Sequence, residues 1–244
     1  MPRIGIRRQW SGMDRTSEIV SLPLGIAQVE WRRNTRARRV SLRIDPRGGS
    51  VVVTLPSRAG RGAGMALLQT HADWITTRLA SLPGRVAFTD GAELPIAGVI
   101  HTIRHVPAAR GGAWLHGTEL QVAGHAEHLS RRVLDFLRTE AQRRLTDLVA
   151  IKAAQLGIRP HRITVKDTIS RWGSCAADGS LAFSWRLVMA PHYVQDYVVA
   201  HEVAHLRHLN HGSQFWALVA ELTDHMEPAM RWLRQEGIRL LRIG

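Results

Sequence analysis

Hydrophobic and polar residues alternate in the first part of the chain, between residues 26 and 56. Apolar side chains occupy every second position in residues 27–31 and 40–44, and a nearly continuous apolar segment, residues 51–55, follows the turn-forming sequence at 46–49. A period of two is typical of strands that bury one face. This region is therefore predicted to form a meander of antiparallel strands.

The spacing of apolar residues becomes helical at two later places. Between residues 64 and 82, Leu68, Ile75 and Leu79 recur at helical intervals, and a proline follows at residue 83. A second apolar stripe runs from residue 126 to a glycine at residue 157, which predicts a long helix with a glycine after its last turn. Short apolar segments and glycine-containing turns between these helices predict two hairpins over residues 93–122.

The last part of the chain combines strands with helices. Residues 163–168 and 181–185 have the composition of strands, and Pro191 opens a helix that is predicted to continue to about His208. Ser213 is expected to cap a further helix, and a C-terminal helix follows.

Together these patterns predict an α+β fold in three parts. Residues 1–22 are expected to be a flexible tail. Residues 23–125 are expected to form a β-rich region with one helix, and residues 126–244 a catalytic region.

The chain is strongly basic, with 33 Lys and Arg against 20 Asp and Glu, a net charge of +13. This excess indicates a surface that attracts polyanions, so nucleic acid is one expected partner. Only Lys152 and Lys166 are lysines. A bias of the coding sequence toward arginine would give the same excess, and both interpretations stay open.

Cysteine content and apolar runs bear on the compartment. The single cysteine, Cys175, excludes a disulfide within the chain, as is usual in a reducing compartment. No apolar run approaches the roughly 18 residues of a membrane span, and the first residues lack the apolar segment of a secretory signal. We expect a cytoplasmic protein without a membrane partner.

The strongest chemical signal is an H-E-x-x-H motif formed by His201, Glu202 and His205. On a helix, residues four apart lie on one face, so both imidazoles can bind one metal ion while Glu202 reaches a water molecule on it. In a chain of this composition, about 0.03 such motifs are expected by chance. The motif therefore predicts a zinc hydrolase in which Glu202 is the general base.

A third ligand is expected from His211, six residues after His205. Asn210 and Gly212 tolerate the left-handed backbone that ends many helices, so a turn there would bring His211 back toward the metal. Glu221 on the following helix is the alternative third ligand. Three imidazoles with one open position suit Zn²⁺, which is the predicted cofactor.

Several segments together resemble the YgjP-like metallopeptidase-domain family, a group of predicted metal-dependent hydrolases. They are SRWGSC, LAFSWRLVMAP and HEVAHLRHLNHGSQFW, with the earlier VSLRID, VVVTLP and HADWITTRL. The chain is more distantly similar to the SprT-like and WLM zinc proteases. The resemblance implies that residues 126–244 form a zincin-like domain whose active-site helix carries the H-E-x-x-H motif.

The resemblance also implies individual roles. His201, His205 and His211 match the zinc ligands, and Glu202 matches the catalytic acid/base. The SRWGSC motif is placed near the active site, so Arg171 and Trp172 are expected to position the substrate. A second donor to the developing oxyanion is expected from Arg171, Tyr193, Tyr197 or His208.

Three functions fit these residues. The first is a metallopeptidase that uses a Glu-activated water on a peptide or protein substrate. The second is a metal-dependent hydrolase of a nucleotide or other phosphate substrate, since the same water can attack phosphorus. The third is a nucleic-acid-associated protein with structural zinc, which the open ligand position disfavours because structural zinc sites are normally closed by four protein ligands.

Overall fold

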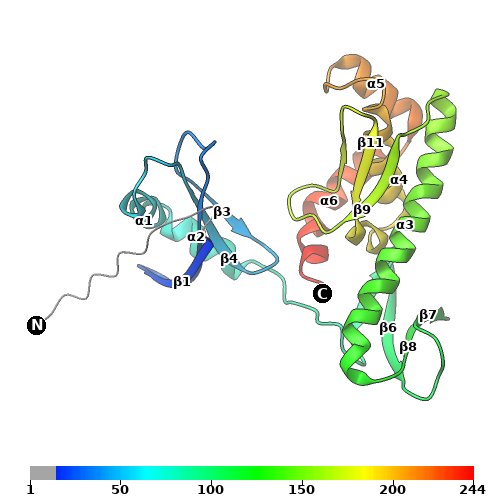
Figure 1. Ribbon diagram of the computed structural model, residues 1–244, viewed down its shortest axis with the longest axis horizontal. Coiled ribbons are helices and arrows are strands. Elements are labelled where there is room, and N and C mark those ends of the chain that lie inside the picture. The colour runs from blue at the N-terminus through cyan, green and yellow to red at the C-terminus, as the bar shows by residue number, and fades with distance from the viewer. Residues whose placement is uncertain (1–14) are drawn as a thin grey trace, which may run out of the picture. The chain divides into compact units, whose positions relative to one another are not determined.

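The protein is described by a computed structural model of residues 15–244, which has a mixed α+β architecture (Figure 1). The chain divides into two compact units, Met1–Leu82 and Pro83–Gly244. Each unit has its own hydrophobic core. Residues 1–14, which belong to the predicted tail, lie outside the described part of the chain.

The first unit contains a four-stranded sheet and two helices. Its elements are β1 (Arg15–Leu22), β2 (Gly25–Arg33), β3 (Ser41–Asp45), β4 (Ser50–Leu55), α1 (Arg61–Thr70) and α2 (Ala72–Ala80). The strand order is β1-β2-β4-β3. Alternate residues of β2, such as Val29 and Trp31, are buried with Leu68 and Ile75 of the helices, as the sequence pattern predicts.

Three predictions for this unit are wrong in detail. Residues 15–22 of the predicted tail form β1. The predicted meander is interrupted, because β2 pairs in parallel with β4 and β3 pairs antiparallel with the other edge of β4. Five of the six residues of β4 are buried, which suits a central strand, whereas β3 exposes Ser41 and Arg43 and lies at the edge. The single helix predicted here is two helices that meet at His71.

The second unit begins with two hairpins, as predicted. Its first elements are β5 (Glu93–Ile96), β6 (Val99–Val106), β7 (Ala113–His116) and β8 (Glu119–Ala123), in the order β5-β6-β8-β7. The long helix α3 (Leu129–Leu156) follows, and Gly157 ends it with a left-handed φ of 65°. This confirms the glycine that the sequence predicted at this helix end.

A second sheet and three helices complete the second unit. They are β9 (Arg162–Lys166), β10 (Gly173–Cys175), β11 (Ser180–Ser184), α4 (His192–Ala204), α5 (Ser213–Leu222) and α6 (Met226–Leu241). The strand order is β10-β11-β9, with β10 antiparallel and β9 parallel to β11. The sequence pattern predicts β9 and β11, but it misses the three-residue edge strand β10.

Both sheets of the second unit share one core with α3 and α4. Leu94 and Ile103 from the first of these sheets belong to the same buried cluster as Leu137 of α3 and Leu187. The boundary between the two compact units therefore lies between residues 82 and 83 of the chain, whereas the sequence patterns suggested a boundary near residue 125. Within residues 15–244, no helix is long and apolar enough to cross a membrane.

Candidate metal centre

The helix α4 presents the H-E-x-x-H motif at its C-terminal end. Nine of its thirteen residues are buried, because α3, α5, α6 and β10 all pack against it. His201 and Glu202 lie in the last helical turn, and His205 is the residue directly after the helix. The two imidazoles thus stand one turn apart on a segment that tertiary contacts hold firmly.

His211 joins these two histidines. One ligand atom from each of His201, His205 and His211 lies within 4.8 Å of the others, and the Nε2 atoms of His201 and His211 are 3.2 Å apart. Two nitrogens bound to one tetrahedral zinc ion at the usual bond length are about 3.3 Å apart. The His201–His211 pair therefore has the spacing of two ligands of one ion, and His205 is close enough to be the third. Glu221, the alternative ligand, is exposed and is not among the grouped residues.

The chain reaches His211 by a different turn from the one predicted. The helix stops at Ala204, and the amide of His208 donates a hydrogen bond to the Ala204 carbonyl, 3.0 Å away. Gly212 has φ −74°, and neither it nor Asn210 adopts a left-handed conformation. The prediction of a left-handed turn is therefore wrong. Gly212, rather than Ser213, is the N-cap of α5.

Aromatic residues at the start of α5 form one wall of the cluster. Phe215 stacks on His205 with 4.5 Å between ring centroids, and it lies 4.7 Å from the His211 ring. Trp216 lies 5.7 Å from His211. Their contacts restrict the rotation of the imidazoles, which orients the ring nitrogens.

The environment favours neutral imidazoles. Burial, and after it the neighbouring His205 and His211, lowers the pKa of His201 to about 4. Burial also lowers the pKa of His205. The Nδ1 atom of His205 lies 2.9 Å from the carbonyl oxygen of His208. A proton on that Nδ1 would leave Nε2 with a free lone pair, the state in which histidine binds metals.

Glu202 is buried beside the histidines, with 6% of its surface exposed. Burial raises the pKa of its carboxyl to about 7, against the opposing effect of Arg171. The main chain at Gly173 of β10 lies directly against it: a Cβ atom at this position would lie 2.5 Å from Cγ and Oε1 of Glu202. A glycine inside a strand often marks such a close approach, but the sequence analysis did not single out Gly173.

A cavity of about 310 Å³ opens at this cluster. It is lined by Arg171, Gly173, Ser174, Cys175, His201, Glu202, His205, Leu209 and His211. The carboxylate, the imidazoles and the backbone of β10 thus face the same cavity.

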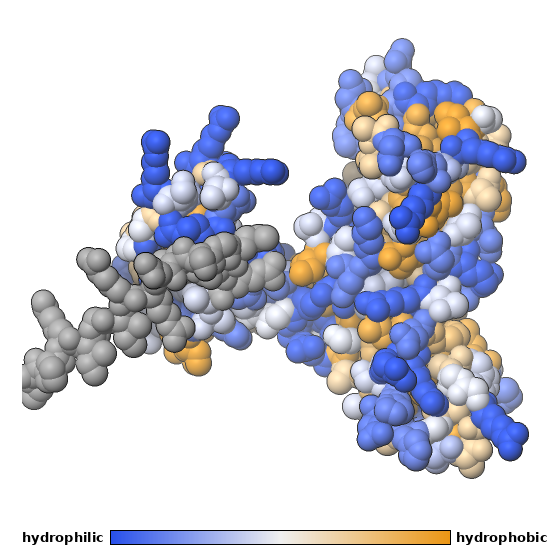
Figure 2. All heavy atoms as spheres, viewed as in Figure 1, coloured by the Kyte–Doolittle hydropathy of each residue, from blue (hydrophilic) through white to orange (hydrophobic). Residues whose placement is uncertain are grey.

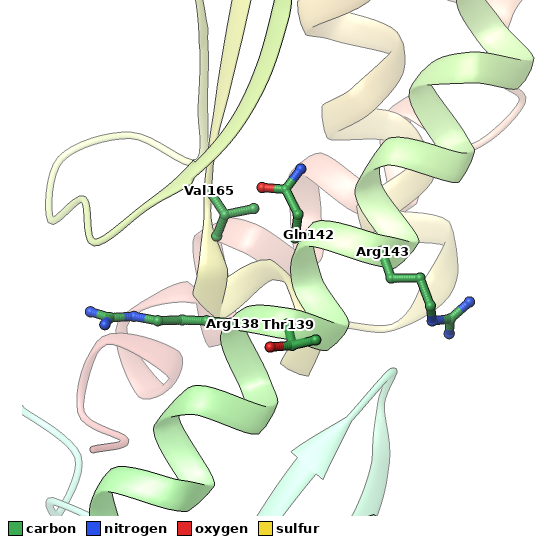
Figure 3. A pocket seen from close by; sticks show the side chains of 5 residues that line it. All are labelled: Arg138, Thr139, Gln142, Arg143 and Val165. Atoms are coloured by element: carbon green, nitrogen blue, oxygen red, sulfur yellow. The ribbon is translucent and has the colours of Figure 1, made fainter.

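A larger cavity of about 500 Å³ lies beside α3 and β9, where Val165 and Gln142 are neighbours and Arg143 points away from the strand (Figure 3). Neither histidine nor carboxylate lines that second cavity, so it lacks the groups for metal chemistry.

The other residues predicted for the site are placed differently. Trp172 does not line the cavity; its ring packs toward Gly237 of α6. Tyr197 is buried, Tyr193 packs beside His225, and neither lines the cavity. His208 contributes its carbonyl oxygen to His205 and is likewise absent from the lining. Of the predicted substrate-positioning and oxyanion residues, the structure brings only Arg171 to the cavity.

The raised pKa of Glu202 predicts a pH-dependent stability of the metal-free protein. A carboxyl whose pKa is about 7 when folded and 4.5 when unfolded stabilises the fold fully below pH 4.5, and this contribution is lost as the pH rises through 7. Glu202→Gln removes the dependence. At pH 8 the metal-free variant should therefore be more stable than the wild type by up to about 3 kcal/mol.

Urea unfolding of both proteins in a chelator, from pH 4.5 to pH 8, measures this difference. The stability gap between the variant and the wild type should widen steadily as the pH rises. A gap that does not change with pH would show that the carboxyl of Glu202 has an ordinary pKa.

Comparison with known proteins identifies the family of the chain. A family model described as "YgjP-like, metallopeptidase domain" matches residues 38–236. Among solved structures, the chain is similar to the metallopeptidase zymogen jannalysin of Methanocaldococcus jannaschii, with 18% identity and a TM-score of 0.35. That alignment covers 38% of this chain and 95% of the other. A search of curated proteins gives no match.

Proposed function

Because the chain belongs to the YgjP-like family of metallopeptidase domains, we propose that it is a zinc-dependent peptidase in which Glu202 activates the attacking water. Membership of this family means that the protein is a metal-dependent hydrolase of peptides or proteins. The zinc ion, its ligands and the role of Glu202 are the parts that we add. One observation carries them: a buried carboxylate and three histidines face the same cavity.

His201, His205 and His211 are the proposed ligands. The Nε2 atoms of His201 and His211 have the separation of two ligands on a tetrahedral ion, and a ligand atom of His205 lies within 4.8 Å of the other two ligands. The environment keeps His201 and His205 neutral. The Nε2 atom of His201 faces the cluster, while its Nδ1 atom is buried without a hydrogen-bond partner among the described residues. A zinc ion there would polarise a water molecule and the substrate carbonyl, lowering the pKa of the water to about 7.

Glu202 is the proposed proton carrier. A nearby cation would lower the pKa of this carboxyl from its raised value, so the carboxylate would be present at neutral pH and could accept a proton from the water. The same oxygen would then deliver the proton to the leaving amine nitrogen. Gly173 holds the carboxylate in place, since its backbone leaves no space for Glu202 to move toward β10.

The edge strand β10 is the proposed docking site for the substrate backbone. It pairs with β11 along one edge, while its residues Gly173, Ser174 and Cys175 line the cavity. An extended peptide could pair with the other edge through main-chain hydrogen bonds, which favour no particular side chain. Arg171, directly before Trp172 and β10, would contact the carbonyl oxygen or an acidic side chain of the peptide.

The cavity favours a peptide over a phosphate substrate. Arg171 is the only cationic side chain among the described residues that line it. Phosphate sites usually combine several cationic or amide donors. A nucleic-acid-associated protein with structural zinc is a weaker alternative, because the fourth side of the histidine cluster opens on the cavity.

The proposal predicts a metal-dependent proteolytic activity. Incubation with a chelator should reduce cleavage of casein to background, and one equivalent of Zn²⁺ per chain should restore it. Nucleoside triphosphates serve as the competing substrates in the same assay. Zinc-dependent release of phosphate without casein cleavage would contradict a peptidase.

Gly173→Ala is expected to lower kcat/KM about 100-fold with little loss of zinc. The added methyl group overlaps Glu202, and a displacement of the general base by about 1 Å can cost this much. Kinetics on a peptide substrate, together with metal analysis, measure both quantities. Gly112→Ala is the matched control, because a Cβ there has open space around it. Equal activity of the two variants would refute the positioning role of Gly173.

A further inference from the structure

Positive charge is concentrated in the first unit, whereas the metal centre belongs to the second. Residues 15–82 contain eleven arginines and four carboxylates, a net charge of +7. Residues 83–244 are more than twice as numerous and carry 19 Lys and Arg against 15 Asp and Glu, a net charge of +4. Hydrophilic side chains project from the first unit in Figure 2. The proposed peptidase site gives no reason for this surplus.

The loop between β2 and β3 exposes three of these arginines. The amide of Asn34 donates to the Leu55 carbonyl at 2.9 Å, and the Asn34 side-chain oxygen accepts from the Arg36 amide at 2.9 Å. The loop is therefore anchored through its backbone. The side chains of Arg36, Arg38 and Arg39 stay exposed.

A fourth exposed arginine, Arg58, lies at the same end of the sheet, in the loop after β4. The Arg33 side chain ties this loop to the end of β2, because it donates a hydrogen bond to the carbonyl of Ser57 at 2.7 Å. We call Arg36, Arg38, Arg39 and Arg58 the arginine cluster.

Carboxylates do not neutralise this cluster. Within residues 15–244, none of its four members forms an ion pair. Glu18 pairs with Arg61, Glu30 pairs with Arg32 at 2.9 Å, and Asp45 is buried. Because no carboxylate of residues 15–82 forms an ion pair with a cluster member, the cluster produces an uncompensated positive potential at this end of the sheet.

The chemistry of the cluster fits phosphate groups. Each guanidinium offers a planar set of donors that can contact a phosphate through two parallel hydrogen bonds. The loop, residues 34–40, contains no aromatic side chain on which a base could stack. Contacts to the sugar–phosphate backbone carry little sequence information, so binding here would be independent of base sequence.

A membrane surface fits less well. Membrane-binding surfaces combine basic residues with adjacent apolar ones. Of the exposed large apolar side chains of residues 15–82, Ile19, Leu24 and Ile26 lie on β1, at its turn to β2 and at the start of β2, and Trp74 lies on α2. None of them is in the two loops that carry the cluster, which adjoin the end of β2, about 26 Å along the strand from its start. We propose that the arginine cluster binds the phosphate backbone of nucleic acid and so brings the chain to it.

The test measures binding of the full chain to a random-sequence 20-base-pair DNA duplex over a range of salt concentrations. Each phosphate contact contributes about 0.9 to the slope of log K against log salt. Replacing all four cluster arginines by alanine should make the slope shallower by about 3 to 4 and lower the affinity at least tenfold. Replacing them by lysine should keep most of the slope and guards against a folding defect.

A matched variant replaces Arg110, Arg131, Arg159 and Arg231, four exposed arginines of the second unit without an ion pair, by alanine. It removes the same charge and should retain tight binding. Equal loss in the two alanine variants would overturn the proposal in favour of diffuse charge attraction. Tighter binding to polyglutamate or to phosphatidylserine vesicles than to DNA would overturn it in favour of an acidic protein or a membrane. Casein cleavage should be unchanged in the cluster variant, so this test is independent of the peptidase proposal.

Discussion

Glu202→Gln is expected to lower peptide hydrolysis about 1000-fold while the chain still binds one zinc ion. The amide has the shape of the carboxyl and keeps its place against Gly173, but it cannot accept the proton of the attacking water. Metal analysis and kcat on one synthetic peptide, both on the same preparation, separate the two effects.

The matched control is Glu221→Gln, the same change at an exposed glutamate of α5 outside the cavity. It should leave both zinc content and kcat at the wild-type values. Loss of zinc in Glu202→Gln would make this carboxylate a ligand, and retained turnover would exclude it as the general base.

His211→Ala is the second change with a large expected effect, a loss of zinc affinity of at least about 100-fold. Removing a residue that only orients a metal ligand typically lowers metal affinity 10- to 100-fold. Removing a ligand itself should lower it at least as much. His211 comes from a loop rather than from α4, so its removal should leave the helix and the core intact. Competition with a chromogenic zinc chelator measures the affinity.

Two alanine variants control for this change. His208→Ala removes a side chain from the same loop and keeps the carbonyl that contacts His205, so zinc affinity should stay within a few-fold of the wild type. Glu221→Ala removes the alternative ligand. Zinc loss in Glu221→Ala, with normal affinity in His211→Ala, would transfer the third ligand position to the carboxylate.

The sequence predicted the histidine cluster because its geometry is mostly local. Two residues four apart on a helix share a face whatever surrounds them, so His201 and His205 follow from spacing alone. His211 was expected near the other two histidines and lies there, but the predicted left-handed turn at Asn210 and Gly212 is not formed. After Ala204 the amides of Leu206 and Arg207 donate to carbonyls three residues earlier instead of four, and no glycine in the sequence marks this end of the helix.

Contacts between distant segments were harder to predict. The approach of Gly173 to Glu202 depends on how β10 packs against α4, and a three-residue strand has too few residues to show a period. Trp172 was expected beside the substrate, but its apolar ring packs toward α6. Trp172 lies at a bend just before β10, and of the two residues only Arg171 lines the cavity.

In the fold, too, single elements were easier to predict than contacts between elements. Single elements such as α3 were predicted closely because their patterns repeat over many turns, and Gly157 marks the end. The continuous apolar segment at residues 51–55 is consistent with the buried strand β4, but the pattern of residues 26–56 does not specify which strands are neighbours or in which direction they run. The parallel pairing of β2 with β4 is evident only from the three-dimensional structure.

The central proposal is that the Glu202 carboxylate and the three-histidine cluster hydrolyse peptide bonds. Zinc-loaded wild type and Glu202→Gln are incubated with the same denatured protein, and new N-termini are identified by mass spectrometry. New termini should accumulate with the wild type, disappear with a chelator and be nearly absent with Glu202→Gln. Identical termini from both proteins, or none from the wild type at any zinc concentration, would contradict the proposal.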